Sequence, residues 1–236
     1  MPTLLLVRHG RSTANSSGVL AGWSPGVDLD QEGREQAAAL AARLAAVPLA
    51  RVVCSPLDRC RQTVQPLLAT RPELGPADLD ERIGECRYGD WTGRPLSELA
   101  KEPLWRTVQD HPSAAVFPGP EGESVAEMSH RAVEAVREWD TRVAEEHGPD
   151  AVWLACAHGD IIKAVVADAL GLHLDLFQRI SAEPASVTAI RYTPLRPFLL
   201  RLGDTGDLSS LAPPPAPPGD GARQQSDAVV GGSTGA

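Results

Sequence analysis

Two short apolar segments, each followed within two residues by His-Gly, constrain the fold of this chain most. Residues 4–7 lead into Arg-His-Gly at 8–10, and residues 152–157 lead into His-Gly at 158–159. Apolar runs of this length without alternation are typical of strands buried on both faces, as in parallel sheets. Ligands of open α/β sheets bind just beyond the carboxyl ends of such strands. The sequence therefore predicts a parallel sheet with reactive side chains at one edge, where Gly10 is expected to let the chain turn sharply.

Length, charge and composition exclude several classes of protein. With 236 residues, 42% of them hydrophobic, one domain with one large core is expected. A net charge of −9 disfavours nucleic-acid and membrane partners, which need a basic face. No apolar run approaches the roughly 18 residues of a membrane span, and no signal peptide is recognisable. Four cysteines are too few for a disulfide framework, which favours a reducing cytoplasm.

Strand and helix patterns alternate along the body of the chain. Strands are expected at 4–7, 51–54, 77–79, 152–157, 187–192 and 198–202, and helices at 31–47, 56–69, 124–146 and 160–170. Ser55 is expected to cap the second helix, with Pro56 at its first position and Asp58 completing a capping box. This order predicts an α/β fold, a three-layer α/β/α sandwich with a mostly parallel central sheet. The last two strands are close enough for a hairpin, which makes one edge antiparallel.

Two segments break this alternation. Residues 94–123 contain five prolines and are expected to form short helices and loops that cover a site. Residues 207–236 are rich in proline, glycine, serine and glutamine without periodicity, a composition typical of disorder. We therefore expect one folded domain over 1–206 and a flexible, solubilising tail without a recognisable motif over 207–236.

Arginines and histidines at the ends of these elements indicate an anion site. Arg8 and His9 follow the first strand, Arg59 falls in the first turn of a helix, and His158 precedes another helix. Helix N-termini favour anions, and arginine matches phosphate oxygens with a bidentate fork. The residues also allow a metal alternative, in which both histidines and Glu85 form a facial triad for iron. The two arginines disfavour a divalent cation, so no metal is expected.

The motifs around these residues resemble those of the histidine phosphatase superfamily, which includes cofactor-dependent phosphoglycerate mutase. The resemblance rests, in the family's order, on residues 8–15 (RHGRSTAN), 22–23 (GW), 54–59 (CSPLDR), 85–93 (ECRYGDWTG), 122–124 (GES) and 157–159 (AHG). It extends from residue 4 to about residue 202. It implies a phosphoglycerate mutase-like fold and leaves a homodimer open. Neither a P-loop nor a dinucleotide-binding glycine motif is present, and no cofactor is expected.

The resemblance also implies a role for each residue at the site. His9 would be the nucleophile that takes the phosphoryl group as phosphohistidine, and Glu85 would protonate the leaving oxygen. Arg8, Arg59 and His158 would neutralise the phosphoryl oxygens. The further phosphate- and substrate-binding residues that the resemblance implies are Asn15, Gly22, Trp23 and Gly159.

The role of Glu85 as general acid places two opposing demands on its pKa. Nearby arginines should lower the pKa of Glu85, whereas a general acid must hold its proton near the working pH. An incoming phosphate dianion would offset the arginines. Asp160, two residues after His158, is the alternative acid, although its position also suits a helix cap.

The acceptor of the phosphoryl group decides between two activities: water gives a phosphatase, and a substrate hydroxyl gives a mutase. The segment between the acid and the second histidine is shorter than in phosphoglycerate mutases and lacks their recognisable cationic stretch. Arg94, Lys101 and Arg106 could still bind a second anionic group. We expect a cytoplasmic phosphatase that acts on a small phosphorylated metabolite, with a phosphomutase as the alternative. A non-catalytic phosphate-binding regulatory module is the second alternative, and it is disfavoured because His9, Arg59 and His158 are all present.

Overall fold

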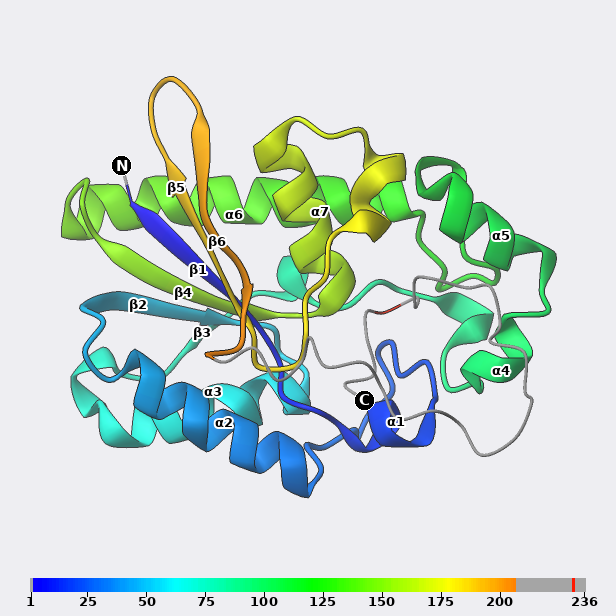
Figure 1. The fold of residues 1–236 in the computed structure, drawn as a ribbon, viewed down its shortest axis with the longest axis horizontal. Coiled ribbons are helices and arrows are strands. Elements are labelled where there is room, and N and C mark those ends of the chain that lie inside the picture. The colour runs from blue at the N-terminus through cyan, green and yellow to red at the C-terminus, as the bar shows by residue number, and fades with distance from the viewer. Residues whose placement is uncertain (1, 207–230, 232–236) are drawn as a thin grey trace.

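The computed structural model describes residues 2–206 and Gly231. Its centre is a six-stranded sheet of order β3-β2-β4-β1-β5-β6 (Figure 1). The strands are β1 (Thr3–Arg8), β2 (Leu49–Cys54), β3 (Asp78–Leu79), β4 (Val152–Ala157), β5 (Val187–Tyr192) and β6 (Pro197–Asp204). The pairs β1–β4, β2–β4 and β2–β3 are parallel, whereas β1–β5 and β5–β6 are antiparallel. The predicted mostly parallel sheet with an antiparallel edge is confirmed.

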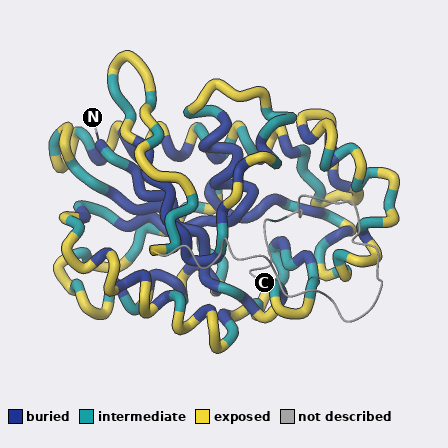
Figure 2. Tube along the Cα trace, viewed as in Figure 1, coloured by how far each residue is buried: buried dark blue, intermediate teal, exposed yellow. Residues whose placement is uncertain are grey.

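Helices cover both faces of this sheet. The long helices are α2 (Gln31–Leu44) and α3 (Asp58–Thr70) on one face, and α6 (Val125–His147) and α7 (Gly159–Leu170) on the other (Figure 1). Alternate residues of β1 supply the two cores. Leu4 and Leu6 pack with α6 and α7, whereas Leu5 and Val7 pack with α2 and α3. Figure 2 shows the buried residues gathered along the sheet and the inner sides of the helices, so the three-layer sandwich is confirmed.

The short α-helices gather at the end of the sheet toward which β1 runs (Figure 1). The short α-helices are α1 (Thr13–Ser17), α4 (Leu96–Leu99) and α5 (Pro103–Asp110). The 3-10 helices are η1 (Pro72–Leu74), η2 (Glu81–Ile83), η3 (Gly89–Trp91), η4 (Pro112–Ala114) and η5 (Leu174–Arg179). The proline-rich segment thus forms short helices as predicted, whereas α1 was missed because five residues are too few for a periodic pattern.

Two local predictions are wrong. Ser55 does not cap the second helix, because α3 begins at Asp58 after Leu57, which makes no side-chain cap. Gly10 is not needed for a turn, since its φ lies outside the left-handed region. A Cβ at Gly10 would instead lie 2.7 Å from the carbonyl oxygen of Gly33 in α2. The glycine therefore permits a close approach between the loop after β1 and this helix.

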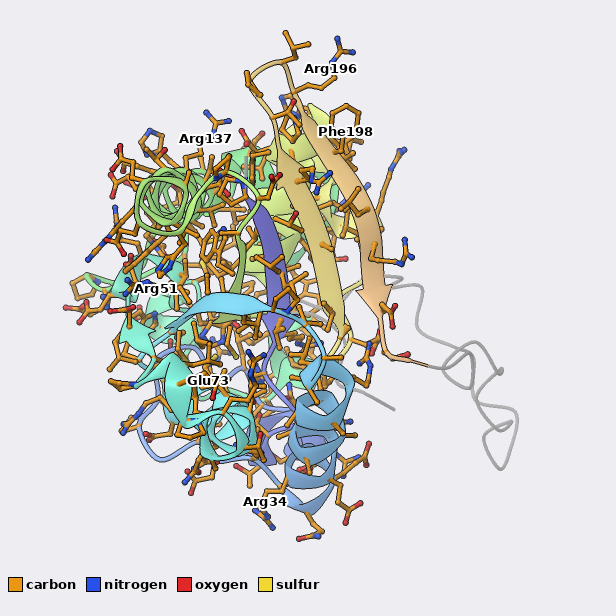
Figure 3. All side chains as sticks on the ribbon, turned by 90° about the vertical axis from the view of Figure 1, so that its left-hand side faces the viewer. Arg34, Arg51, Glu73, Arg137, Arg196 and Phe198 are labelled. Atoms are coloured by element: carbon orange, nitrogen blue, oxygen red, sulfur yellow. The ribbon has the colours of Figure 1, made fainter. Side chains whose placement is uncertain are left out.

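The two edges of the sheet differ in how they are covered. Arg51 of β2 pairs with Asp78 Oδ2 of β3 at 2.8 Å and with Glu146 of α6, which ties one edge to the helical layer (Figure 3). At the other edge the β5–β6 hairpin projects outward, with Arg196 at its turn and Phe198 exposed (Figure 3). The predicted tail over 207–236 lies outside the described residues, with the exception of Gly231.

Candidate active site

The carboxyl ends of β1 and β4 bring the two predicted histidines together. The strands pair so that Arg8 lies opposite Ala157, and His9 and His158 follow directly. The centroids of the two imidazole rings are 5.2 Å apart, and the ring planes are tilted by 59°. Both rings are buried. The edge predicted from the two His-Gly segments is therefore a single site.

A backbone hydrogen bond defines the tautomer of His9. Its Nδ1 lies 2.7 Å from the carbonyl oxygen of Gly10. Because a carbonyl can only accept, Nδ1 carries the proton and Nε2 keeps its lone pair. Burial lowers the pKa of His9 well below its usual range, and Arg59 and Arg8 lower it further. The imidazole is therefore neutral at physiological pH, the state in which it can attack phosphorus.

Thr63 of α3 links the loop after β1 to the arginine of α3. The backbone N–H of Gly10 donates to Thr63 Oγ1 at 2.9 Å, and the hydroxyl of Thr63 donates to the carbonyl oxygen of Arg59 at 2.7 Å. This chain of hydrogen bonds fixes His9 relative to Arg59.

The two predicted arginines are buried beside the histidines. Arg59 Nη2 donates to the carbonyl oxygen of Gly22 at 2.9 Å and to His158 Nδ1 at 3.2 Å. Arg8 Nη1 donates to the carbonyl oxygen of Ala182 at 2.8 Å, while Arg8 Nε has no hydrogen-bond partner among the described residues. Desolvation lowers the pKa of Arg8. A buried guanidinium with an unpaired donor is costly on its own, so this arrangement favours binding of an anion.

Ser55 and Arg59 hold His158 from its two ring nitrogens. Ser55 Oγ lies 2.8 Å from His158 Nε2, and Arg59 donates to Nδ1. Because a guanidinium can only donate, Nδ1 is an acceptor and Nε2 carries the proton that Ser55 accepts. Burial, followed by the charge of Arg59, lowers the pKa of His158 well below its usual range. The serine predicted as a helix cap thus positions a histidine of the site.

Burial decides the conflict over the pKa of Glu85. Glu85 Oε1 accepts from the backbone N–H of Cys86 at 3.0 Å, and Oε2 lies 3.7 Å from His158 Nδ1. Desolvation, reinforced by the carboxylate of Asp160, raises the pKa of Glu85 to about 7 despite the nearby arginines. At neutral pH a large share of this carboxyl is therefore protonated, as a general acid requires.

Asp160 belongs to a buried network rather than capping α7. Its carboxylate accepts from the hydroxyl of Tyr88 at 3.0 Å and from Lys163 Nζ at 3.4 Å. Helix α7 has no side-chain cap, so that predicted role of Asp160 is wrong. Because the carboxylate of Asp160 accepts hydrogen bonds on both oxygens, the geometry favours Glu85 over Asp160 as the proton donor.

Arg131 of α6 holds the backbone that carries Glu85. Its Nη1 donates to the carbonyl oxygens of Arg82 and Gly84 at 2.7 and 2.9 Å, and its Nη2 donates to that of Glu85 at 3.0 Å. Glu123 binds the same guanidinium at 2.5 and 2.9 Å. Sequence reasoning missed this pair, since the GES motif contains Glu123 but gives no sign of its partner.

One pocket gathers most of the predicted residues. It is lined by His9, Ser12, Asn15, Val19, Leu20, Ala21, Gly22, Arg59, Glu85, Tyr88, Leu96 and Gly231. Asn15 Oδ1 accepts from Ser12, which leaves the amide NH₂ of Asn15 to donate. Gly159 is the first residue of α7, so its N–H belongs to the first turn and has no partner within the helix. Trp23 is not a lining residue; its indole N–H donates to the carbonyl oxygen of Glu85 at 2.6 Å.

Residues 2–206 and Gly231 contain neither a metal-ligand cluster nor a membrane-spanning helix. Within them, no set of three or more histidine, cysteine, aspartate and glutamate side chains is placed to hold a metal ion. The lone pair on His158 Nδ1 faces Arg59 instead. None of the described helices combines the length and apolarity that crossing a bilayer needs.

Comparison with known proteins gives the family. The model of the histidine phosphatase superfamily (branch 1) matches residues 4–205. A probable phosphatase of Schizosaccharomyces pombe is 32% identical over 162 residues, 69% of this chain and 70% of that protein. A 2,3-bisphosphoglycerate-dependent phosphoglycerate mutase of Caulobacter vibrioides is 30% identical over 188 residues, 70% of this chain and 79% of that protein.

Solved structures agree with this family. Bacillus stearothermophilus YhfR superposes with a TM-score of 0.76 at 28% identity, covering 86% of this chain and 98% of that one. A mycobacterial glucosyl-3-phosphoglycerate phosphatase, solved with VO3, gives a TM-score of 0.74 at 26% identity, with the same coverage of 86% and 98%. The chain belongs to branch 1 of the histidine phosphatase superfamily, a family of phosphatases and phosphoglycerate mutases.

Proposed function

We propose that this chain is a phosphatase that hydrolyses a small phosphomonoester through a phosphohistidine at His9. Nε2 of His9 attacks phosphorus while the P–O bond to the alcohol breaks, and Glu85 gives its proton to the leaving oxygen. Water then attacks the phosphohistidine, and the Glu85 carboxylate takes a proton from that water. The N–P bond breaks, inorganic phosphate leaves, and both residues return to their starting state.

Positive charge beside His9 supports both steps. Arg8 and Arg59 lie close enough to lower the pKa of His9, and they would meet the charge on the equatorial oxygens of the transferring group. A bound phosphate dianion would raise the pKa of His158, so that its Nδ1 could donate to phosphate. The neutral donors that would complete the site are the amide of Asn15 and the backbone N–H of Gly159.

The placement of cations is the observation that favours water as the acceptor. A phosphoglycerate mutase must hold the carboxylate of its substrate as well as the phosphate. The proline-rich segment, residues 94–123, instead contributes Leu96 to the pocket, which Leu20 also lines. Its cations Arg94 and Arg106 each pair with a carboxylate of the same segment, at 2.8 and 3.1 Å, and Lys101 is exposed. The lining that surrounds the phosphate site therefore suits a monoester with a weakly polar alcohol.

The relatives support phosphoryl transfer in general, since phosphatases and mutases both occur among them. A phosphomutase is therefore the second candidate function. Two statements remain predictions: that the substrate is a small phosphorylated metabolite, and that the protein acts in the cytoplasm.

A paired assay distinguishes the candidates. We expect the purified chain to release inorganic phosphate from p-nitrophenyl phosphate and from a panel of metabolite phosphates, and His9→Ala to release none. Interconversion of 3- and 2-phosphoglycerate that depends on 2,3-bisphosphoglycerate, without net phosphate release, would establish the mutase instead. Phosphate binding without turnover of any substrate in the panel would favour the regulatory module.

A further inference from the structure

Gly231, far along the chain from the folded domain, lies inside the catalytic pocket. Its backbone N–H donates to Asp160 Oδ2 at 2.9 Å, and its carbonyl oxygen accepts from Arg8 Nη2 at 3.5 Å. It lines the same pocket as His9 and Glu85. The backbone of this single residue therefore contacts both a carboxylate and a guanidinium of the site.

The position accepts glycine for two reasons. The φ of Gly231 is +82°, a backbone conformation that L side chains rarely adopt. A Cβ built there would lie 3.4 Å from both Leu20 Cδ1 and Tyr88 Oη, so the branches of a larger side chain would meet the pocket wall. The fit between this residue and the pocket is therefore steric as well as polar.

The contact with Arg8 uses a donor that phosphate would need. Arg8 Nη1 already donates to the carbonyl oxygen of Ala182. The Gly231 carbonyl therefore accepts from Nη2, one of the nitrogens that Arg8 has left for a phosphate oxygen. The free volume in the pocket is about 30 Å³. That volume holds water but no phosphomonoester. Substrate and the peptide at Gly231 therefore compete for one space.

We propose that the chain inhibits itself at Gly231, whose backbone binds the catalytic pocket in competition with the phosphomonoester. The inference rests on the proposed phosphatase function, because it takes the pocket as the substrate site. If the peptide occupies the pocket about nine-tenths of the time, the apparent affinity for substrate is reduced about tenfold. The maximal rate is unaffected, since saturating substrate displaces the peptide.

The test uses the full chain and three variants. The variants are a deletion of residues 231–236, Gly231→Val, and Gly219→Val as a matched control elsewhere in 207–236. We expect the deletion and Gly231→Val to lower the KM for p-nitrophenyl phosphate about three- to tenfold while kcat changes less than twofold. Gly219→Val should match the full chain. A synthetic peptide of residues 227–236 should inhibit the deletion variant competitively.

A binding measurement separates this inference from the proposed function. Calorimetric titration with inorganic phosphate needs no turnover, and phosphate should bind the deletion variant and Gly231→Val more tightly than the full chain by the same factor. If no variant hydrolyses any ester but this difference in affinity is found, the proposed function fails and the inference stands. Equal phosphate affinity in all four proteins, or a higher KM in the deletion variant, overturns the inference.

Discussion

The clearest consequence of the site is that Glu85→Gln should reduce catalysis and increase stability in one substitution. Glutamine keeps the shape of the side chain and an oxygen that can accept from the backbone N–H of Cys86. It cannot transfer a proton. General acids contribute about 10²–10⁴-fold to a rate, and we expect kcat to fall in this range for an alkyl phosphate. The loss should be smaller for p-nitrophenyl phosphate, whose leaving group needs less proton transfer.

The stability change follows from the raised pKa of Glu85. Folding moves this pKa from 4.5 to about 7, so the folded state favours the protonated carboxyl. The stability that this provides is fully present below pH 4.5 and is lost as the pH rises through about 7. The full difference corresponds to about 3 kcal/mol at alkaline pH. Glu85→Gln carries no charge at any pH and should therefore be more stable than the parent at pH 9, by up to that amount.

Two measurements check this pair of effects. Urea unfolding of both proteins from pH 5 to pH 9 should show a stability difference that grows through neutral pH and then levels off. The kcat/KM of the parent should decline above about pH 7, as the acid loses its proton, and this alkaline limb should be missing in the variant. A stability difference that does not depend on pH would refute the assignment of a buried, protonated Glu85. An equal loss of kcat for both substrates would refute its role as the acid.

Three other substitutions test the supports of the site. Arg131→Met removes the hydrogen bonds to the backbone that carries Glu85. It should lower kcat about tenfold and displace the alkaline limb of the pH profile, and Arg131→Lys should restore part of both. An unchanged pH profile in Arg131→Met would assign Arg131 to stability alone. Ser55→Ala removes the oxygen partner of the His158 Nε2 proton and leaves only Cys60 Sγ, at 3.5 Å, among the described residues. It should reduce kcat/KM about three- to tenfold, and wild-type kinetics would count against the assigned tautomer. Gly10→Ala forces a Cβ against the backbone of α2 and should cost about 1–3 kcal/mol in urea unfolding, whereas an unchanged midpoint would show that the loop can retreat.

The sequence predicted what depends on local pattern. The apolar runs before His9 and His158 are strands, and their parallel pairing follows from the βαβ order. The helix predicted over 124–146 begins at Val125, where Ser124 and Glu127 form a capping box. Such features are encoded within a few neighbouring residues.

The sequence did not predict what depends on distant contacts. Ser55 looks like a cap locally, but its hydroxyl meets His158, 103 positions away. The pKa of Glu85 depends on burial, which outweighs the arginines visible in the sequence. Trp23 matched a substrate-facing motif, yet its indole N–H holds the Glu85 backbone. Gly231 carries no motif, and only the folded pocket makes its positive φ and its two hydrogen bonds meaningful.

The most direct test of the account is to trap the phosphorylated enzyme. The chain should be mixed with substrate, quenched within the first turnover in alkali and digested for mass spectrometry, since a phosphohistidine survives base and is lost in acid. The account predicts one phosphoryl group on the peptide that contains His9, and none on that peptide in His9→Ala. Continued turnover by His9→Ala, or a first-turnover phosphoryl group on any other side chain, would contradict it.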